Sequence, residues 1–129
     1  MTDKVCIVCV TGTLEKLQMA AMIASVSVAT GKEVSIFLSM NAMKFFVKSN
    51  TELPPVEGDV GELLMKKGVP PYKQLFGHSI DLGDASILPC SMAMDIMNLS
   101  SEDLDEELGP PTGLTKFLSE AEGAQIYTF

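Results

Sequence analysis

Three cysteines are the residues of this sequence whose chemistry could define a function, and they stand in two settings. Cys6 and Cys9 have the spacing of a C-x-x-C redox motif. They lie, however, in the apolar run 4–10, which is typical of a buried strand, whereas redox-active pairs open a helix. Because strand positions three apart face opposite sides, we expect Cys6 and Cys9 to be separate core residues.

Cys90 stands where a predicted strand ends and a predicted helix begins. The free N–H groups and the dipole of a helix start favour the thiolate, which is the nucleophilic form. Such a thiolate could accept sulfane sulfur and hold it as a persulfide, whose charge the same N–H groups would stabilise. The alternative is one more small core residue. No later cysteine could resolve a disulfide, which disfavours a dithiol redox enzyme, whereas a carrier needs one thiol.

Further polar and apolar residues follow the predicted strands. The carboxyl ends of parallel strands meet at one edge of a sheet, where ligands and reactive groups collect. We expect five residues at this edge to bind a substrate around the nucleophile Cys90: Gly12, Thr13, Asn41, Ser91 and Met92. Ser91 and Met92 are expected beside the thiol and the other three on the opposite wall. A tight strand-to-helix turn explains Gly12 equally well.

The remaining candidates for chemistry point to simpler roles. His78 is the only histidine, and no Asp, Glu or Cys spacing completes a metal site around it. We therefore expect His78 at the surface, with no metal and no organic cofactor implied. The nine methionines suit the core or a subunit interface, where flexible thioethers fill gaps, or an apolar lining around a persulfide.

The elements that must position these residues alternate between strand and helix. Short apolar runs predict strands at 4–10, 33–38, 85–89 and 124–129. Helical spacing predicts helices at 14–28, 42–47, 60–67, 72–78, 91–99 and 114–122. The proline-containing stretch 49–59 is expected to be a loop that serves as a lid or an interface. This order predicts one α/β domain over residues 1–129, with helices on both faces of a mainly parallel sheet.

Composition excludes several classes of protein. With 129 residues, 47% of them hydrophobic and 20% charged, the sequence fits one folded domain. The net charge of −8 and the absence of a basic cluster exclude a nucleic-acid binder. No apolar run approaches the roughly 18 residues of a membrane span, and no signal peptide precedes the first strand. We therefore expect a cytoplasmic protein with reduced thiols and no membrane partner.

Four stretches of the sequence together resemble the DsrE/DsrF/DsrH-like sulfur-relay family, whose members are often labelled peroxiredoxin-like. They are the Gly12 turn with the Ala-rich helix 14–30, the second predicted strand at 31–37, the segment 65–70, and the segment 89–97. The last is the most specific, because it places Cys90 before a helix rich in Ser and Met.

The resemblance implies a three-layer α/β/α sandwich with about five parallel strands, assembled as a homo-oligomer of trimeric or larger size. It also implies a sulfurtransferase or sulfur carrier acting through Cys90, with sulfur donor and acceptor proteins or small sulfur compounds as partners. Two departures stand out: the second strand ends in the sequence 38–41 without an aromatic segment, and 108–112 marks a strand poorly. Two alternatives remain, a non-enzymatic oligomeric interaction module and a binder of a small anionic ligand.

Overall fold

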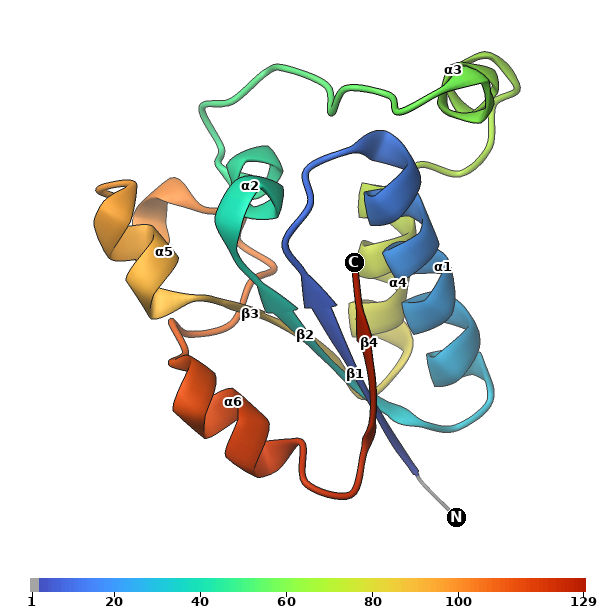
Figure 1. Ribbon diagram of the computed structural model, residues 1–129. Helices are drawn as coiled ribbons and strands as arrows, with labels where there is room; N and C mark the ends of the chain where they lie inside the picture. Colours follow the sequence, from blue (N-terminus) through green and yellow to red (C-terminus); the bar gives the residue numbers. More distant parts are fainter. Residues whose placement is uncertain (1–2) are drawn as a thin grey trace.

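The computed structural model describes residues 3–129, which form one four-stranded, fully parallel sheet with helices on both faces (Figure 1). The strand order across the sheet is β3-β2-β1-β4. The strands are β1 (Lys4–Cys9), β2 (Glu33–Leu38), β3 (Ala85–Pro89) and β4 (Gln125–Thr128). The helices are α1 (Leu14–Ala29), α2 (Met40–Met43), α3 (Asp59–Lys66), α4 (Tyr72–Leu82), α5 (Ser91–Ile96) and α6 (Leu114–Glu120). Short 3-10 turns, Lys44–Phe46 and Ser101–Asp103, complete the described elements.

The three-layer α/β/α arrangement predicted from the sequence is confirmed. Helices α1 and α4 pack together on one face of the sheet, and α6 covers the other (Figure 1). On the α6 face, the ring of Phe117 lies 4.9 Å from that of Phe37 on β2. The apolar runs that predicted β1 and β2 are buried because both strands are covered by helices on both sides.

The expected number of about five strands is wrong, because a fifth regular strand does not form among residues 3–129. The stretch 109–112 does run beside β3, where the N–H groups of Gly109 and Thr112 donate to carbonyls of β3 at 2.8 Å each. Between them stand Pro110 and Pro111, which have no N–H to donate. The pairing of this stretch with the β3 side of the sheet is therefore limited to a single bridge between Cys90 and Thr112.

The short helix after β2 begins two residues before the predicted start at residue 42. Its cap is Ser39, and Met40 adopts a positive φ of 50° there. Near residue 101, Ser100 and Asp103 form a capping box, in which the side chain of each bonds the backbone N–H of the other. Boundaries of this kind depend on local hydrogen bonds that the apolar pattern does not encode.

The loop 48–58 and α3 form an arm that is attached to the beginning of α1. The carboxylate of Glu15 accepts hydrogen bonds from the N–H groups of Glu57 and Gly58, at 2.8–2.9 Å. It thereby caps the start of α3, where Gly58 has no side chain of its own to do so. A side chain at Gly61 would meet this carboxylate at 2.6 Å and would displace the flexible Glu15 side chain from its position.

We expect Glu15→Gln to release the arm, because these N–H groups hold the pKa of Glu15 below its ordinary value. A lowered pKa means that the carboxylate stabilises the fold above its ordinary pKa, and that this contribution is lost as pH falls through the lowered value. In an NMR pH titration, the amides of Glu57 and Gly58 should shift with a midpoint below that of an ordinary glutamate. Glu15→Gln should abolish this transition and speed amide exchange there severalfold. Glu62→Gln, on the exposed side of α3, is the control and should change neither.

Candidate functional site

The carboxyl ends of β1, β2 and β3 meet at one edge of the sheet, as predicted. Backbone hydrogen bonds there join the residue that follows one strand to the end of the neighbouring strand. The N–H of Ser39 donates to the carbonyl of Cys9 at 2.9 Å, and the N–H of Cys90 donates to the carbonyl of Leu38 at 2.8 Å. These bonds extend the parallel ladder by one residue and fix the starts of α2 and α5 side by side.

Cys90 is one of the residues that line a cleft of about 360 Å³ between the sheet, α5 and the start of α6, which we call the Cys90 cleft. Cys90 is a buried residue, 4% exposed. The wall formed by the sheet carries Val8, Phe37 and Ser39. Ser91, Met92, Met40, Val10 and the segment 113–115 complete the lining, which contains no charged side chain.

The backbone around Cys90 is partly committed to other hydrogen bonds. The N–H of Ser91 donates to the carbonyl of Thr112 at 3.0 Å, and the Cys90 thiol forms no capping bond to the first turn of α5. The amides of Met92 and Ala93 form no backbone hydrogen bond among the described residues. These two amides and the hydroxyls that border the cleft are therefore the hydrogen-bond donors that could stabilise an added negative charge.

Cys6 and Cys9 occupy the positions predicted for core residues. Each is 1% exposed, and the regular pairing of β1 with β2 places Cys6 opposite Ser35 and Cys9 opposite Leu38, on opposite faces. All three cysteines are free, so no disulfide joins the C-x-x-C pair. Burial raises the pKa of Cys9 to about 12, which keeps this thiol protonated and unreactive at neutral pH.

Gly12, Thr13 and Asn41 gather at a different hollow, of about 460 Å³, along the same edge of the sheet. Gly12 serves close packing there, because a side chain would meet the carbonyl oxygen of Asn41 at 2.6 Å and the ring of Phe45 at 2.7 Å. The Thr13 hydroxyl donates to the carboxylate of Glu57. The structure thus brings together Cys90, Ser91 and Met92 but places the other three sequence-predicted residues at a neighbouring hollow.

A third hollow, of about 320 Å³, lies between these two, so the edge of the sheet carries a series of adjoining spaces. It shares Met40 with the Cys90 cleft, and Asn41 and Lys44 with the Gly12 hollow. His78 is exposed on α4, as expected. Within residues 3–129, no three His, Cys, Asp or Glu side chains come close enough together to hold a metal ion, and no helix is long and apolar enough to span a membrane.

Sequence reasoning did not single out Ser39 as a site residue, nor the segment 113–115. Ser39 is buried, and its hydroxyl has no hydrogen-bond partner among the described side chains and borders the Cys90 cleft. The only available signal was its place directly after β2. The residues at the start of α6 carried no signal, because only the packing of Phe117 brings that helix over the sheet.

Comparison with known proteins agrees with this architecture. The ychN protein from E. coli has a similar structure, with a TM-score of 0.64 and 15% identity over 100% of both chains. MTH1491 from Methanobacterium thermoautotrophicum, a protein of unknown function, has a TM-score of 0.60 and 13% identity over 98% of both chains. At these identities the likeness concerns the fold. No curated protein matches the sequence.

The family model of the DsrE/DsrF/DrsH-like family matches residues 44–129, which is two thirds of the sequence. The chain belongs to the DsrE/DsrF/DrsH-like family.

Proposed function

We propose that this protein carries sulfane sulfur on the thiol of Cys90, as a sulfur carrier or sulfurtransferase. The observation that supports this most directly is the setting of Cys90 directly after β3, in the lining of a cleft, in a chain of the DsrE/DsrF/DrsH-like family. The other two cysteines are enclosed within β1 and lack such an opening. A carrier needs a single reactive thiol, and Cys90 is the cysteine that lines a cleft.

The reaction is a sulfur transfer between a donor and the Cys90 thiolate. The thiolate attacks the outer sulfur of a donor such as thiosulfate, a new S–S bond forms, and the donor's S–S bond breaks with release of sulfite. The product is the Cys90 persulfide anion, which an acceptor thiolate then attacks at its outer sulfur, restoring the Cys90 thiolate. No electrons are gained or lost overall, so the reaction requires neither an external oxidant nor a reductant.

The surroundings of Cys90 suit a persulfide. The cleft of about 360 Å³ has room for one more sulfur atom, and its apolar lining limits attack by water. The amides of Met92 and Ala93 and the Ser39 hydroxyl are donors that the fold leaves without backbone or side-chain partners. These groups would bind the terminal sulfur of the persulfide, whose negative charge strengthens a hydrogen bond.

The test is the intact mass of the protein after incubation with thiosulfate or a small persulfide. We expect the wild type to gain one sulfur atom, a gain that dithiothreitol reverses, and Cys90→Ser to gain none. Cys6→Ser is the matched control and should load like the wild type. No adduct on the wild type, or equal adducts on the wild type and Cys90→Ser, would reject the proposal. In the second case the chain would be better described as an interaction module or a binder of a small ligand.

A further inference from the structure

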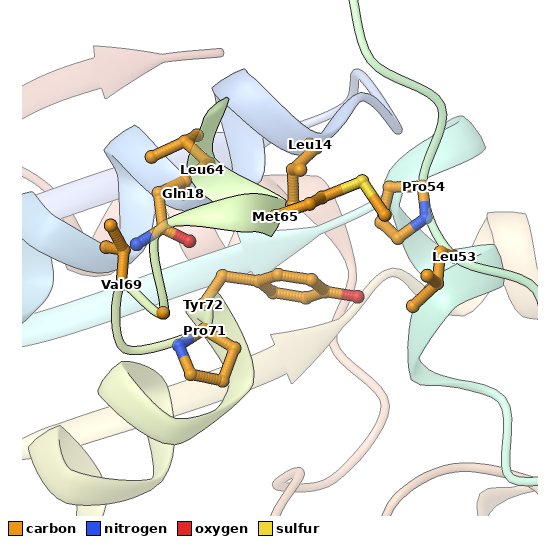
Figure 2. A pocket seen from close by; sticks show the side chains of 10 residues that line it. Leu14, Gln18, Leu53, Pro54, Leu64, Met65, Val69, Pro71 and Tyr72 are labelled. Atoms are coloured by element: carbon orange, nitrogen blue, oxygen red, sulfur yellow. The ribbon is translucent and has the colours of Figure 1, made fainter. Parts of the chain in front are cut away.

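A small apolar pocket lies away from Cys90, between the arm and the helices α1 and α4. Its volume is about 200 Å³, and Figure 2 shows its lining side chains. Leu14 and Gln18 come from α1, Leu53 and Pro54 from the loop, Leu64 and Met65 from α3, and Val69 and Pro71 from the segment between α3 and α4. We call it the Tyr72 pocket, because the ring of Tyr72 at the start of α4 lies across it.

Tyr72 is the feature that distinguishes this pocket from a packing defect. Its side chain is 7% exposed, and its hydroxyl points toward Leu53 and Pro54 (Figure 2). The hydroxyl forms no hydrogen bond to any described residue and is not fully enclosed. Because it points toward Leu53 and Pro54, which line the pocket, an occupant of the pocket can serve as its partner in place of water.

Gln18 adds a second polar group to the same wall. The residue is 4% exposed, and its amide nitrogen donates to the carbonyl of Pro70 at 2.9 Å. This bond fixes the side chain and leaves its carbonyl oxygen as a free acceptor above the Tyr72 ring (Figure 2). The pocket thus presents one donor and one acceptor within otherwise apolar walls, which is the usual composition of a small-molecule site.

Size and charge narrow the class of ligand. A cavity of about 150 Å³ holds benzene, so 200 Å³ accommodates one ring with one or two substituents. No charged side chain lines the pocket. Burial, with the nearby Asp105, raises the pKa of Tyr72 to about 12, so its hydroxyl remains a neutral donor and the surroundings disfavour an anion.

We propose that the Tyr72 pocket binds a neutral, single-ring molecule whose hydroxyl or carbonyl oxygen accepts a hydrogen bond from Tyr72. A hydroxyl on the ligand could donate to Gln18 in turn. This site is separate from Cys90, since the pocket and the Cys90 cleft have no lining residue in common. Leu53 lies on both the Tyr72 pocket and the Gly12 hollow, so the arm forms a wall of each.

The experiment is an NMR titration of the full chain with p-cresol, toluene and benzoate. We expect p-cresol to bind with a Kd of about 1 mM or tighter, shifting the methyl signals of Leu14, Leu64 and Met65. Toluene, which lacks the hydroxyl, should bind more weakly, and benzoate should not bind. Tyr72→Phe should weaken p-cresol binding about five- to tenfold and leave toluene binding unchanged.

Two control variants make the result decisive. Tyr127→Phe alters the only other tyrosine, on β4, and should bind p-cresol like the wild type. Cys90→Ser should also bind it normally, so the result stands apart from the sulfur-carrier proposal. If p-cresol produces no saturable shifts at these methyl groups up to about ten times the expected Kd, or binds Tyr72→Phe and the wild type equally, the proposal is overturned.

Discussion

Brief treatment of the native protein with iodoacetamide near pH 8 is expected to alkylate Cys90 at least about a hundredfold faster than Cys9. Only the thiolate reacts, and a thiol with a pKa of about 12 is ionised in roughly one molecule in ten thousand at that pH. Burial raises the pKa of Cys6 as well. Access of the reagent should increase the difference in rate further, since Cys90 lines a cleft while the other two cysteines lie beneath helices.

Peptide mapping by mass spectrometry measures the three rates separately. In denaturant, where burial is lost, all three cysteines should react at similar rates, and this is the internal control. Alkylation of Cys90 as slow as that of Cys9 in the native state would show that the cleft does not admit a small electrophile. Such a result would also count against Cys90 as the acceptor of sulfur from any donor of comparable size.

Phe117→Ala is expected to lower the free energy of unfolding by about 3–5 kcal/mol. The Phe117 side chain is 1% exposed and packs against the ring of Phe37, so its removal loses both buried apolar area and an aromatic contact. Because α6 has only seven residues, it depends on this packing rather than on its own helix propensity. The segment 113–115, which leads into α6 and lines the Cys90 cleft, should lose its fixed position.

Urea unfolding measures the effect, with Leu118→Ala as the matched control in the same helix. Leu118 is 48% exposed, so its truncation should cost less than about 1 kcal/mol. If both variants lost the same stability, the side chain of Phe117 would not be the main anchor of α6. If Phe117→Ala loaded sulfur at the wild-type rate while destabilised, α6 would contribute nothing to the cleft.

Much of this fold could be read from local patterns. The apolar runs at 33–38 and 85–89 match β2 and β3 residue for residue, and the helix predicted at 14–28 forms as α1, ending before Gly31 at a φ of 86°. These elements are predictable because burial on both faces, or on one helical face, demands a continuous or periodic apolar pattern. The burial of Cys6 and Cys9 follows from the same reasoning.

The site was predictable only in part. The position of Cys90 at the junction of β3 and α5 follows from the order of elements along the chain. The separation of Gly12, Thr13 and Asn41 from Cys90 does not, because it depends on how α2 packs at this edge of the sheet. The contact between Gly12 and the Asn41 carbonyl shows that packing brings the two loops together, a requirement that the turn preference of glycine does not reveal.

By itself, the sequence determined which segments are strands and helices and which cysteine stands directly before a helix, because these depend on neighbouring residues and on the balance of apolar and polar side chains. The tertiary structure alone decided the absence of a fifth strand from residues 3–129, the cleft beside Cys90, the capping of α3 by Glu15 and the pocket across Tyr72. Each of these arises where segments far apart in the sequence meet, and their shapes depend on side-chain packing and hydrogen bonds that no local pattern encodes.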